Sequence, residues 1–205
     1  MSGSYLFVID KNYKGGALCE YPNSWLFSPS IWDVLEDKYL KEDEWGMKPR
    51  VIGVGTSAWG DINAIMNQSE NTEERVCWEL SNQQIFYTKD KDVIADNILL
   101  FIKNHKKYGQ KDVVTKEKEC LLTKEHIIER FKQISTDIKK LDETKFPYFV
   151  LKNTSCDDSV EYWFEYDEKK KREKTLKDWD ELPVEFVHIE NGKITGFTRV
   201  EKGNL

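Results

Sequence analysis

The 205-residue sequence contains no long hydrophobic run. Its most apolar window, Val93 to Ile102, is interrupted by Asp96 and Asn97, so it falls short of the roughly 18 consecutive apolar residues of a membrane-spanning helix. The opening residues also lack the basic stretch and the apolar segment of about 7 to 15 residues that mark a secretory signal peptide. We therefore expect a soluble protein that stays in the cytoplasm.

Cysteine and histidine are scarce. The four cysteines have neither Cys-x-x-Cys spacing nor a histidine nearby, which favours reduced, buried thiols over disulfides or a zinc site. The three histidines stand far apart. His105 continues the apolar stripe of a predicted helix and His188 shares a strand face with Val184 and Phe186, so we expect both to pack; His126 falls in a solvated first helical turn. We expect no metal site.

Nucleotide-binding and nucleophile motifs are also missing. The segment Gly53-Val54-Gly55-Thr56-Ser57 has Ala58 where a dinucleotide-binding loop requires its third glycine, and it lacks the Gly-Lys of a P-loop. No Gly-x-Ser-x-Gly elbow is present. Acid pairs such as Asp157-Asp158 are expected by composition among 37 acidic residues, so they do not indicate acid–base catalysis. We expect no cofactor and no enzymatic activity.

The charge is unevenly distributed. Residues 1–88 carry 13 Asp and Glu against 7 Lys and Arg, whereas residues 89–205 carry 24 of each, so the net charge of −6 belongs to the first part. Such a field repels nucleic acid and attracts basic partners. The one basic run, Lys169 to Lys174, follows Glu165, Asp167 and Glu168, which would pair with it, and we expect a solvated loop there. Nucleic acid is therefore excluded as a partner.

The first 88 residues predict one helix among short strands. Tyr5 to Ile9 indicates an opening strand. Ser28 can cap a helix with Pro29 in its first position, and the apolar stripe continues to about Leu40. We expect a short strand or loop at 50–56, a helical turn at 61–67, and two strands within 75–88 joined by the polar residues 81–84, because Val76, Trp78 and Leu80 alternate with other residues.

Two helices are predicted in the middle of the chain. The first covers 90–107, with Gly109 as its stop signal, and the second begins at Thr123. The stretch 110–120, rich in charged residues, is the best candidate for a linker. The apolar stripe of the second helix consists of Ile127, Phe131, Ile134, Ile138 and Leu141.

The last third predicts an antiparallel sheet. Strands are expected at 148–151, 160–166, 184–190 and 193–200, with a charged loop or short helix at 167–177. Asn191-Gly192 joins the final pair and suits a type I′ hairpin turn, which needs positive φ at both positions. Together the elements indicate an α+β fold: a mainly antiparallel sheet with helices packed on one face. We expect one domain over 1–205, with two lobes, 1–110 and 121–205, as the alternative.

Tryptophan is plentiful, with seven residues. Trp25 and Trp45 fall in polar, loop-like contexts within the acidic part, and Trp163 lies between two acids on the outward face of a predicted strand. Exposed aromatic residues among acids are typical anchors of a protein interface that receives a basic partner. The alternative is that Trp25 and Trp45 fold back onto the core.

In overall character the chain resembles the immunity proteins of bacterial contact-dependent growth inhibition and polymorphic toxin systems. The features that carry the resemblance are the helix from Ser28 to Leu40, the acidic run Glu42 to Glu44 beside Trp45, and the Asn191-Gly192 hairpin. The resemblance implies that the protein neutralises a cognate basic toxin, often a nuclease, by covering its active site. The expected partner-binding residues are Glu36, Asp37, Glu42, Asp43, Glu44, Trp45, Trp25, Glu161, Trp163 and Glu165.

Two other functions stay open. One is an enzyme of an unrecognised family, with its site near the Gly53 to Trp59 loop and His105 or an acid as the base. The other is a regulatory or structural subunit that assembles through an edge of its sheet.

Overall fold

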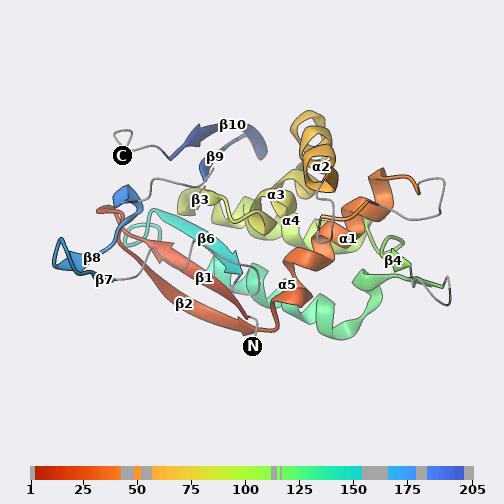
Figure 1. The fold of residues 1–205 in the computed structure, drawn as a ribbon, viewed down its shortest axis with the longest axis horizontal. Coiled ribbons are helices and arrows are strands. Elements are labelled where there is room, and N and C mark those ends of the chain that lie inside the picture. The colour runs from red at the N-terminus through yellow and green to blue at the C-terminus, as the bar shows by residue number, and fades with distance from the viewer. Residues whose placement is uncertain are drawn as a thin grey trace.

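A six-stranded sheet in the order β10-β9-β3-β6-β1-β2 forms the centre of the fold (Figure 1). The computed structural model describes residues 3–42, 49–51, 57–111, 115, 117–153, 166–178 and 184–200. All neighbouring strands are antiparallel except β3 and β9, which run parallel. The strands are β1 (Gly3–Ile9), β2 (Gly15–Pro22), β3 (Ile85–Tyr87), β6 (Tyr148–Asn153), β9 (Glu185–Glu190) and β10 (Lys193–Arg199).

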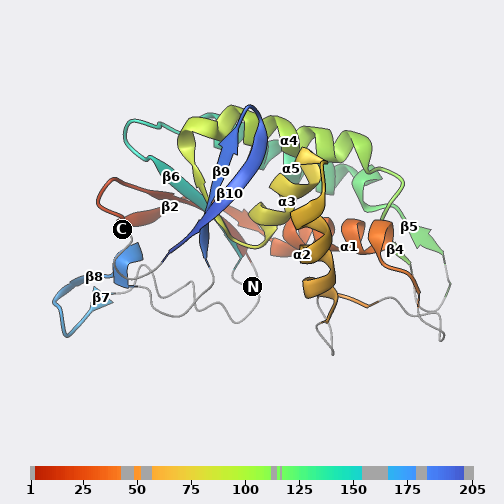
Figure 2. The same cartoon turned by 90° about the horizontal axis from the view of Figure 1, so that it is seen from above.

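Helices cover one face of this sheet, as the sequence predicted (Figures 1 and 2). Alternating residues of β1 explain the two faces: Leu6 and Val8 pack into the large helical core, whereas Phe7 and Ile9 pack into a smaller core on the opposite face. The α+β class with a mainly antiparallel sheet is therefore confirmed. The helices are α1 (Ser28–Tyr39), α2 (Ser57–Gln68), α3 (Thr72–Ser81), α4 (Lys91–Asn104) and α5 (Glu125–Lys139).

The strongly periodic segments fold as predicted. In α5 the predicted apolar stripe is buried throughout, and α4 buries Ile94, Ile98 and Phe101 against it. The β9–β10 turn has φ values of 51° at Asn191 and 79° at Gly192, so the predicted hairpin with two positive φ angles is confirmed. None of the described helices combines the length and apolar character needed to cross a bilayer.

The prediction of a strand at Arg75 to Leu80 was wrong, because these residues belong to α3. Val76, Cys77, Trp78 and Leu80 are all fully buried. A helix buried on several sides loses the polar face that reveals its period, and the remaining pattern imitates strand alternation. The predicted turn at 61–67 is likewise part of the longer helix α2.

Two predicted helix boundaries were also wrong. Ser28 is the first helical residue rather than the cap; Phe27 precedes it without a capping side chain, and Ser28 Oγ instead accepts a hydrogen bond from Asn153 Nδ2 at 2.8 Å. Helix α4 ends at Asn104, before Gly109. A Cβ atom at Gly109 would lie 2.0 Å from the carbonyl oxygen of Glu119, so this glycine permits a close backbone contact.

Where a linker was predicted at 110–120, the described residues include two short paired strands, β4 (Gln110–Lys111) and β5 (Lys118–Glu119). The central sheet takes β1, β2 and β3 from before this pair and β6, β9 and β10 from after it. Both parts of the chain therefore contribute to one sheet. Short helical turns lie at η1 (Ser24–Leu26), η2 (Thr88–Asp90) and η3 (Leu121–Thr123).

Each edge of the sheet carries a β-bulge. Leu18 is the extra residue in β2, because Leu6 pairs with Cys19 and Phe7 with Ala17. Thr195 is the extra residue in β10, because Ile194 pairs with Ile189 and Gly196 with His188. Bulges at edge strands interrupt the regular row of backbone groups that another strand would pair with.

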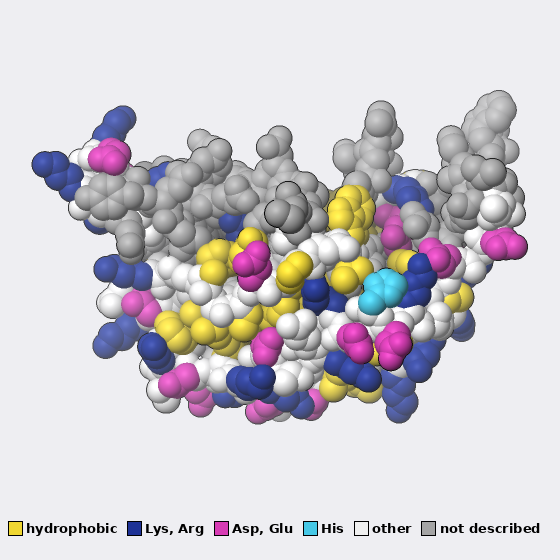
Figure 3. Space-filling view, turned by 90° about the horizontal axis from the view of Figure 1, so that it is seen from below, with side chains coloured by type: hydrophobic (Ala, Val, Ile, Leu, Met, Phe, Trp, Pro, Cys, Tyr) yellow, Lys and Arg dark blue, Asp and Glu magenta, His cyan; other side chains and the backbone are white. Residues whose placement is uncertain are grey.

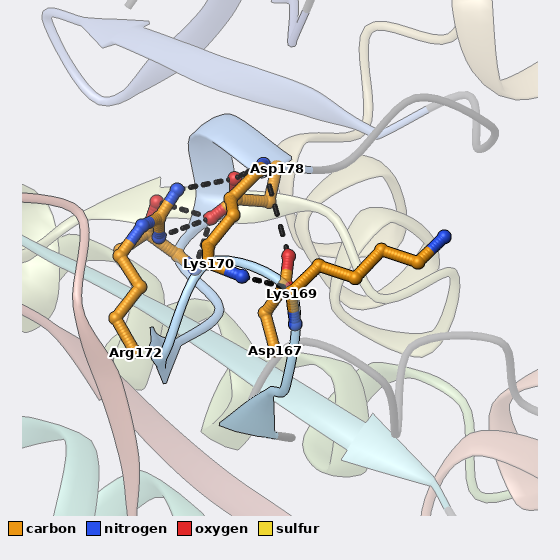
Figure 4. A network of polar contacts seen from close by, with 6 residues as sticks. Asp167, Lys169, Lys170, Arg172 and Asp178 are labelled. Carbon is orange, nitrogen blue, oxygen red and sulfur yellow. Dashed lines mark hydrogen bonds and ion pairs between the residues drawn. The ribbon is translucent and has the colours of Figure 1, made fainter.

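The predicted charged loop at 167–177 contains a second hairpin, β7 (Tyr166–Asp167) with β8 (Arg172–Glu173), followed by η5 (Leu176–Asp178). The predicted strand residues 160–165 lie outside the described part of the chain. Asp178 accepts hydrogen bonds from both terminal nitrogens of Arg172, each at 2.6 Å, and from Lys170 at 2.7 Å (Figure 4). The Arg172 contacts hold the pKa of Asp178 well below its usual value.

The substitution Asp178→Asn should loosen this hairpin locally. The Thr175 N–H donates to Asp178 Oδ2 at 2.8 Å, so weakening the charged acceptor should speed hydrogen exchange of the Thr175 amide by about tenfold. Glu168→Gln, at an exposed position in the same hairpin, is the control and should leave that amide unchanged. Equal exchange rates in both variants would show that Asp178 does not hold the turn.

Candidate functional site at the end of α1

A buried carboxylate joins three helices next to the acidic segment. Glu74 on α3 is fully buried, and it contacts Lys38 Nζ and His105 Nε2 and accepts a hydrogen bond from Tyr39 OH at 2.5 Å. Burial alone would raise the pKa of Glu74, but the hydrogen bonds with His105, Lys38 and Tyr39 outweigh it and lower the pKa to about 2. Glu74 is therefore an ionised internal anchor.

His105 faces an acceptor at each ring nitrogen. Nδ1 lies 3.1 Å from the carbonyl oxygen of Phe101, and Nε2 contacts Glu74. Each ring nitrogen therefore has a polar partner inside the protein. The ring also stacks on Phe101 at a centroid distance of 4.5 Å. The predicted packing role of His105 is confirmed, and both nitrogens are engaged inside the protein.

The contacts of Glu74 with Lys38, Tyr39 and His105 have a structural role. Glu74 already has three donors, and neither it nor His105 is accessible to a substrate. What the cluster does is tie the last turn of α1, which carries Lys38 and Tyr39, to the start of α3 and the end of α4. The point at which the chain leaves α1 is therefore rigidly placed.

Two of the predicted partner-binding acids, Glu36 and Asp37, make internal contacts at this end of α1. Glu36 is only 4% exposed and accepts a hydrogen bond from the Val51 N–H at 2.5 Å. Asp37 accepts from the Gly109 N–H at 3.2 Å and lies 2.5 Å from Lys118 Nζ. These two side chains position the segments that pack against α1.

Glu42 is exposed, two residues beyond the cap of α1. Trp25 is also exposed, at 52%, but it lies in η1 before the other end of α1. Since α1 has 12 residues, about 18 Å separates its two ends. The structure therefore places Trp25 and Glu42 at opposite ends of α1. Asp43, Glu44, Trp45, Glu161, Trp163 and Glu165 lie outside the described residues.

The sequence interpretation missed Glu74, Lys38 and Tyr39 as a cluster. The available signal was Glu73-Glu74 in the first turn of a helix, where acids are favoured, but this signal requires that 72–81 be recognised as helical. Within the described ranges, no three His, Cys, Asp or Glu side chains converge as metal ligands. The loop 52–56, which belongs to the alternative enzyme site, lies outside those ranges.

Comparisons of the chain with protein-family models, with curated proteins and with solved structures found no match.

Proposed function

We propose that this protein is a cytoplasmic immunity protein that binds a basic toxin through the acidic segment following α1. The observation that carries the proposal is the fixed exit of the chain from α1. The Glu74 cluster and the Asp37 contacts immobilise the end of the helix, and the exposed Lys41 and Glu42 follow directly. An acidic segment attached to a rigid support loses less conformational entropy when a partner binds than one attached to a mobile support.

Two further features support this function. The surplus of negative charge in residues 1–88 would speed the approach of a basic protein and imitate the phosphates that a nuclease binds. The bulges at Leu18 and Thr195 disfavour the alternative of assembly through the sheet edges.

The test is co-expression with the toxic C-terminal domain of a large secreted protein encoded next to this chain. Growth should be restored, and the two purified proteins should bind. The triple substitution Glu42→Ala, Asp43→Ala and Glu44→Ala should weaken binding at low salt by about tenfold and reduce its salt dependence, because three charges leave the interface. Calorimetry at two salt concentrations measures both effects.

A matched control removes three acids elsewhere: Asp61→Ala, Glu70→Ala and Glu190→Ala, all at exposed positions. This control has the same net charge as the first triple variant and should keep the affinity within about twofold. If both triple variants lost affinity equally, net charge alone would explain the effect, and the acidic segment would have no special role in binding. A neighbouring toxin domain that does not bind the protein would contradict the proposed function.

A further inference from the structure

Trp25 is exposed, and hydrogen bonds hold its backbone in place. Although 52% exposed, it has both backbone polar groups fixed: its N–H donates to Asn23 Oδ1 at 3.2 Å, and its carbonyl oxygen accepts from Ser30 Oγ at 3.1 Å. Asn23 has a φ of 63°, in the left-handed region that asparagine tolerates better than most residues. An exposed indole adds little to the fold, and because its backbone is already fixed, a partner that covers it has only the side chain left to order.

The same asparagine contacts a cation on α5. The carbonyl oxygen of Asn23 accepts a hydrogen bond from Arg130 Nη1 at 3.4 Å. The guanidinium carbon lies 5.5 Å from the centroid of the Tyr21 ring, and Nε is enclosed without an acceptor. Asn23 therefore positions both Trp25 and Arg130, from segments more than a hundred residues apart in the sequence.

Arg130 has no carboxylate partner among the described residues. Asp137, two helical turns further along α5, instead accepts from Tyr21 OH at 3.3 Å and from Lys140 Nζ at 3.1 Å. Burial lowers the pKa of Arg130, and Tyr21 counteracts this in part. A partly desolvated cation without a counter-charge is unfavourable, and an external carboxylate would relieve it.

We propose that Trp25 and Arg130 form a docking surface for an acidic segment of a protein partner, in which a carboxylate binds Arg130 and a neighbouring apolar side chain covers Trp25. Trp and Arg are the residue types that contribute most to protein interfaces. His126, exposed one turn before Arg130 on α5, provides a second donor for an acidic segment. Figure 3 views the molecule from below and shows hydrophobic side chains with Lys, Arg, Asp and Glu side chains interspersed among them.

This surface is distinct from the one in the proposed function. It lies at the opposite end of α1, its charged anchor Arg130 is a cation, and its partner carries carboxylates rather than basic groups. Substitutions at Trp25 and Arg130 therefore test it independently of the acidic segment that follows α1.

The experiment titrates the folded protein with the peptide acetyl-Glu-Leu-Glu-Leu-Glu-amide and follows the indole N–H resonances by NMR. The Trp25 resonance is assigned from its absence in Trp25→Phe. It should shift and saturate with a Kd of about 1 mM, whereas the peptide with Gln in place of each Glu should bind at least tenfold more weakly. Arg130→Gln should weaken binding of the acidic peptide about tenfold, and Arg130→Lys by less, because Lys keeps the charge but loses the guanidinium fork.

The control variant is Arg199→Gln, which removes an exposed arginine from β10 and should leave the titration unchanged. Dispersed amide spectra of each variant verify the fold. The proposal is overturned if the two peptides bind equally, if Arg130→Gln binds the acidic peptide as the native protein does, or if the Trp25 resonance shifts with protein concentration alone, which would identify a second copy of the chain as the occupant.

Discussion

The substitution Glu79→Gln is expected to stabilise the protein by about 3 kcal/mol at pH 7. Glu79 on α3 is only 5% exposed, and burial, followed by the nearby charge of Glu185, raises its pKa to about 8, while Arg75 opposes the shift. The folded state therefore holds a proton that the unfolded chain releases near pH 4.5. The contribution of this bound proton to the free energy of unfolding is fully present below about pH 4.5 and is lost as the pH rises towards 8.

Chemical denaturation at several pH values measures this effect. A neutral glutamine removes the cost of burying or protonating the acid, so the gain should be close to zero at pH 4 and grow by about 1.4 kcal/mol per pH unit up to about pH 8. Glu70→Gln, at an exposed position just before α3, should change stability by less than about 0.5 kcal/mol throughout. If Glu79→Gln were less stable than the native protein at pH 7, burial of the Glu79 carboxyl group would not destabilise the fold.

Glu74→Gln should have the opposite effect, a loss of about 3 kcal/mol at pH 7. The substitution leaves Lys38 without its buried counter-charge and weakens the hydrogen bond between the side chain at position 74 and His105, and breaking a buried ion pair from one side typically costs about 3 to 5 kcal/mol. Because the pKa of Glu74 in the folded state is about 2, the native protein should keep this stabilisation above about pH 4.5 and lose it as the pH falls towards 2.

The two proteins should therefore converge in stability at low pH, which denaturation at pH 7, 4 and 2.5 can follow. The matched control is Glu119→Gln, because Glu119 also pairs with a lysine, Lys124, but at the surface. Its loss should stay below about 1 kcal/mol. If Glu74→Gln and Glu119→Gln cost the same, the contacts with Glu74 do not depend on burial.

Sequence patterns predicted the helices and turns that neighbouring residues alone can specify. Helix α5 has a solvated face, which makes its apolar stripe visible, and Asn191-Gly192 specifies its own turn. Helix α3 was missed because its buried part reads as strand alternation: Val76, Trp78 and Leu80 alternate with Cys77 and Glu79, and all five are buried. Strand β2 was not predicted; as an edge strand with Ala17 and Leu18 exposed, it does not alternate between apolar and polar residues.

The candidate site could not be predicted from local sequence patterns for a different reason. Glu74 and His105 are 31 residues apart, and Asn23 and Arg130 are 107 apart, so only the tertiary fold brings each pair together. The sequence left open whether Trp25 is exposed or packs onto the core, and in the structure it is exposed. Sequence proximity predicted that acids surround Trp25. In the structure, Asn23 hydrogen-bonds both to Trp25 and to the cation Arg130.

The position of β6 between β1 and β3 has a consequence for synthesis on the ribosome. Ser4 pairs with Asn153, so the first strand must wait for about 150 residues to be translated before its inner neighbour exists. At roughly 5 to 20 residues per second, this delay lasts on the order of ten seconds or more. During that time Leu6 and Val8 on one face of β1, and Phe7 and Ile9 on the other, lack the neighbours that β6 will bring, so the nascent chain exposes apolar surface that favours non-native association.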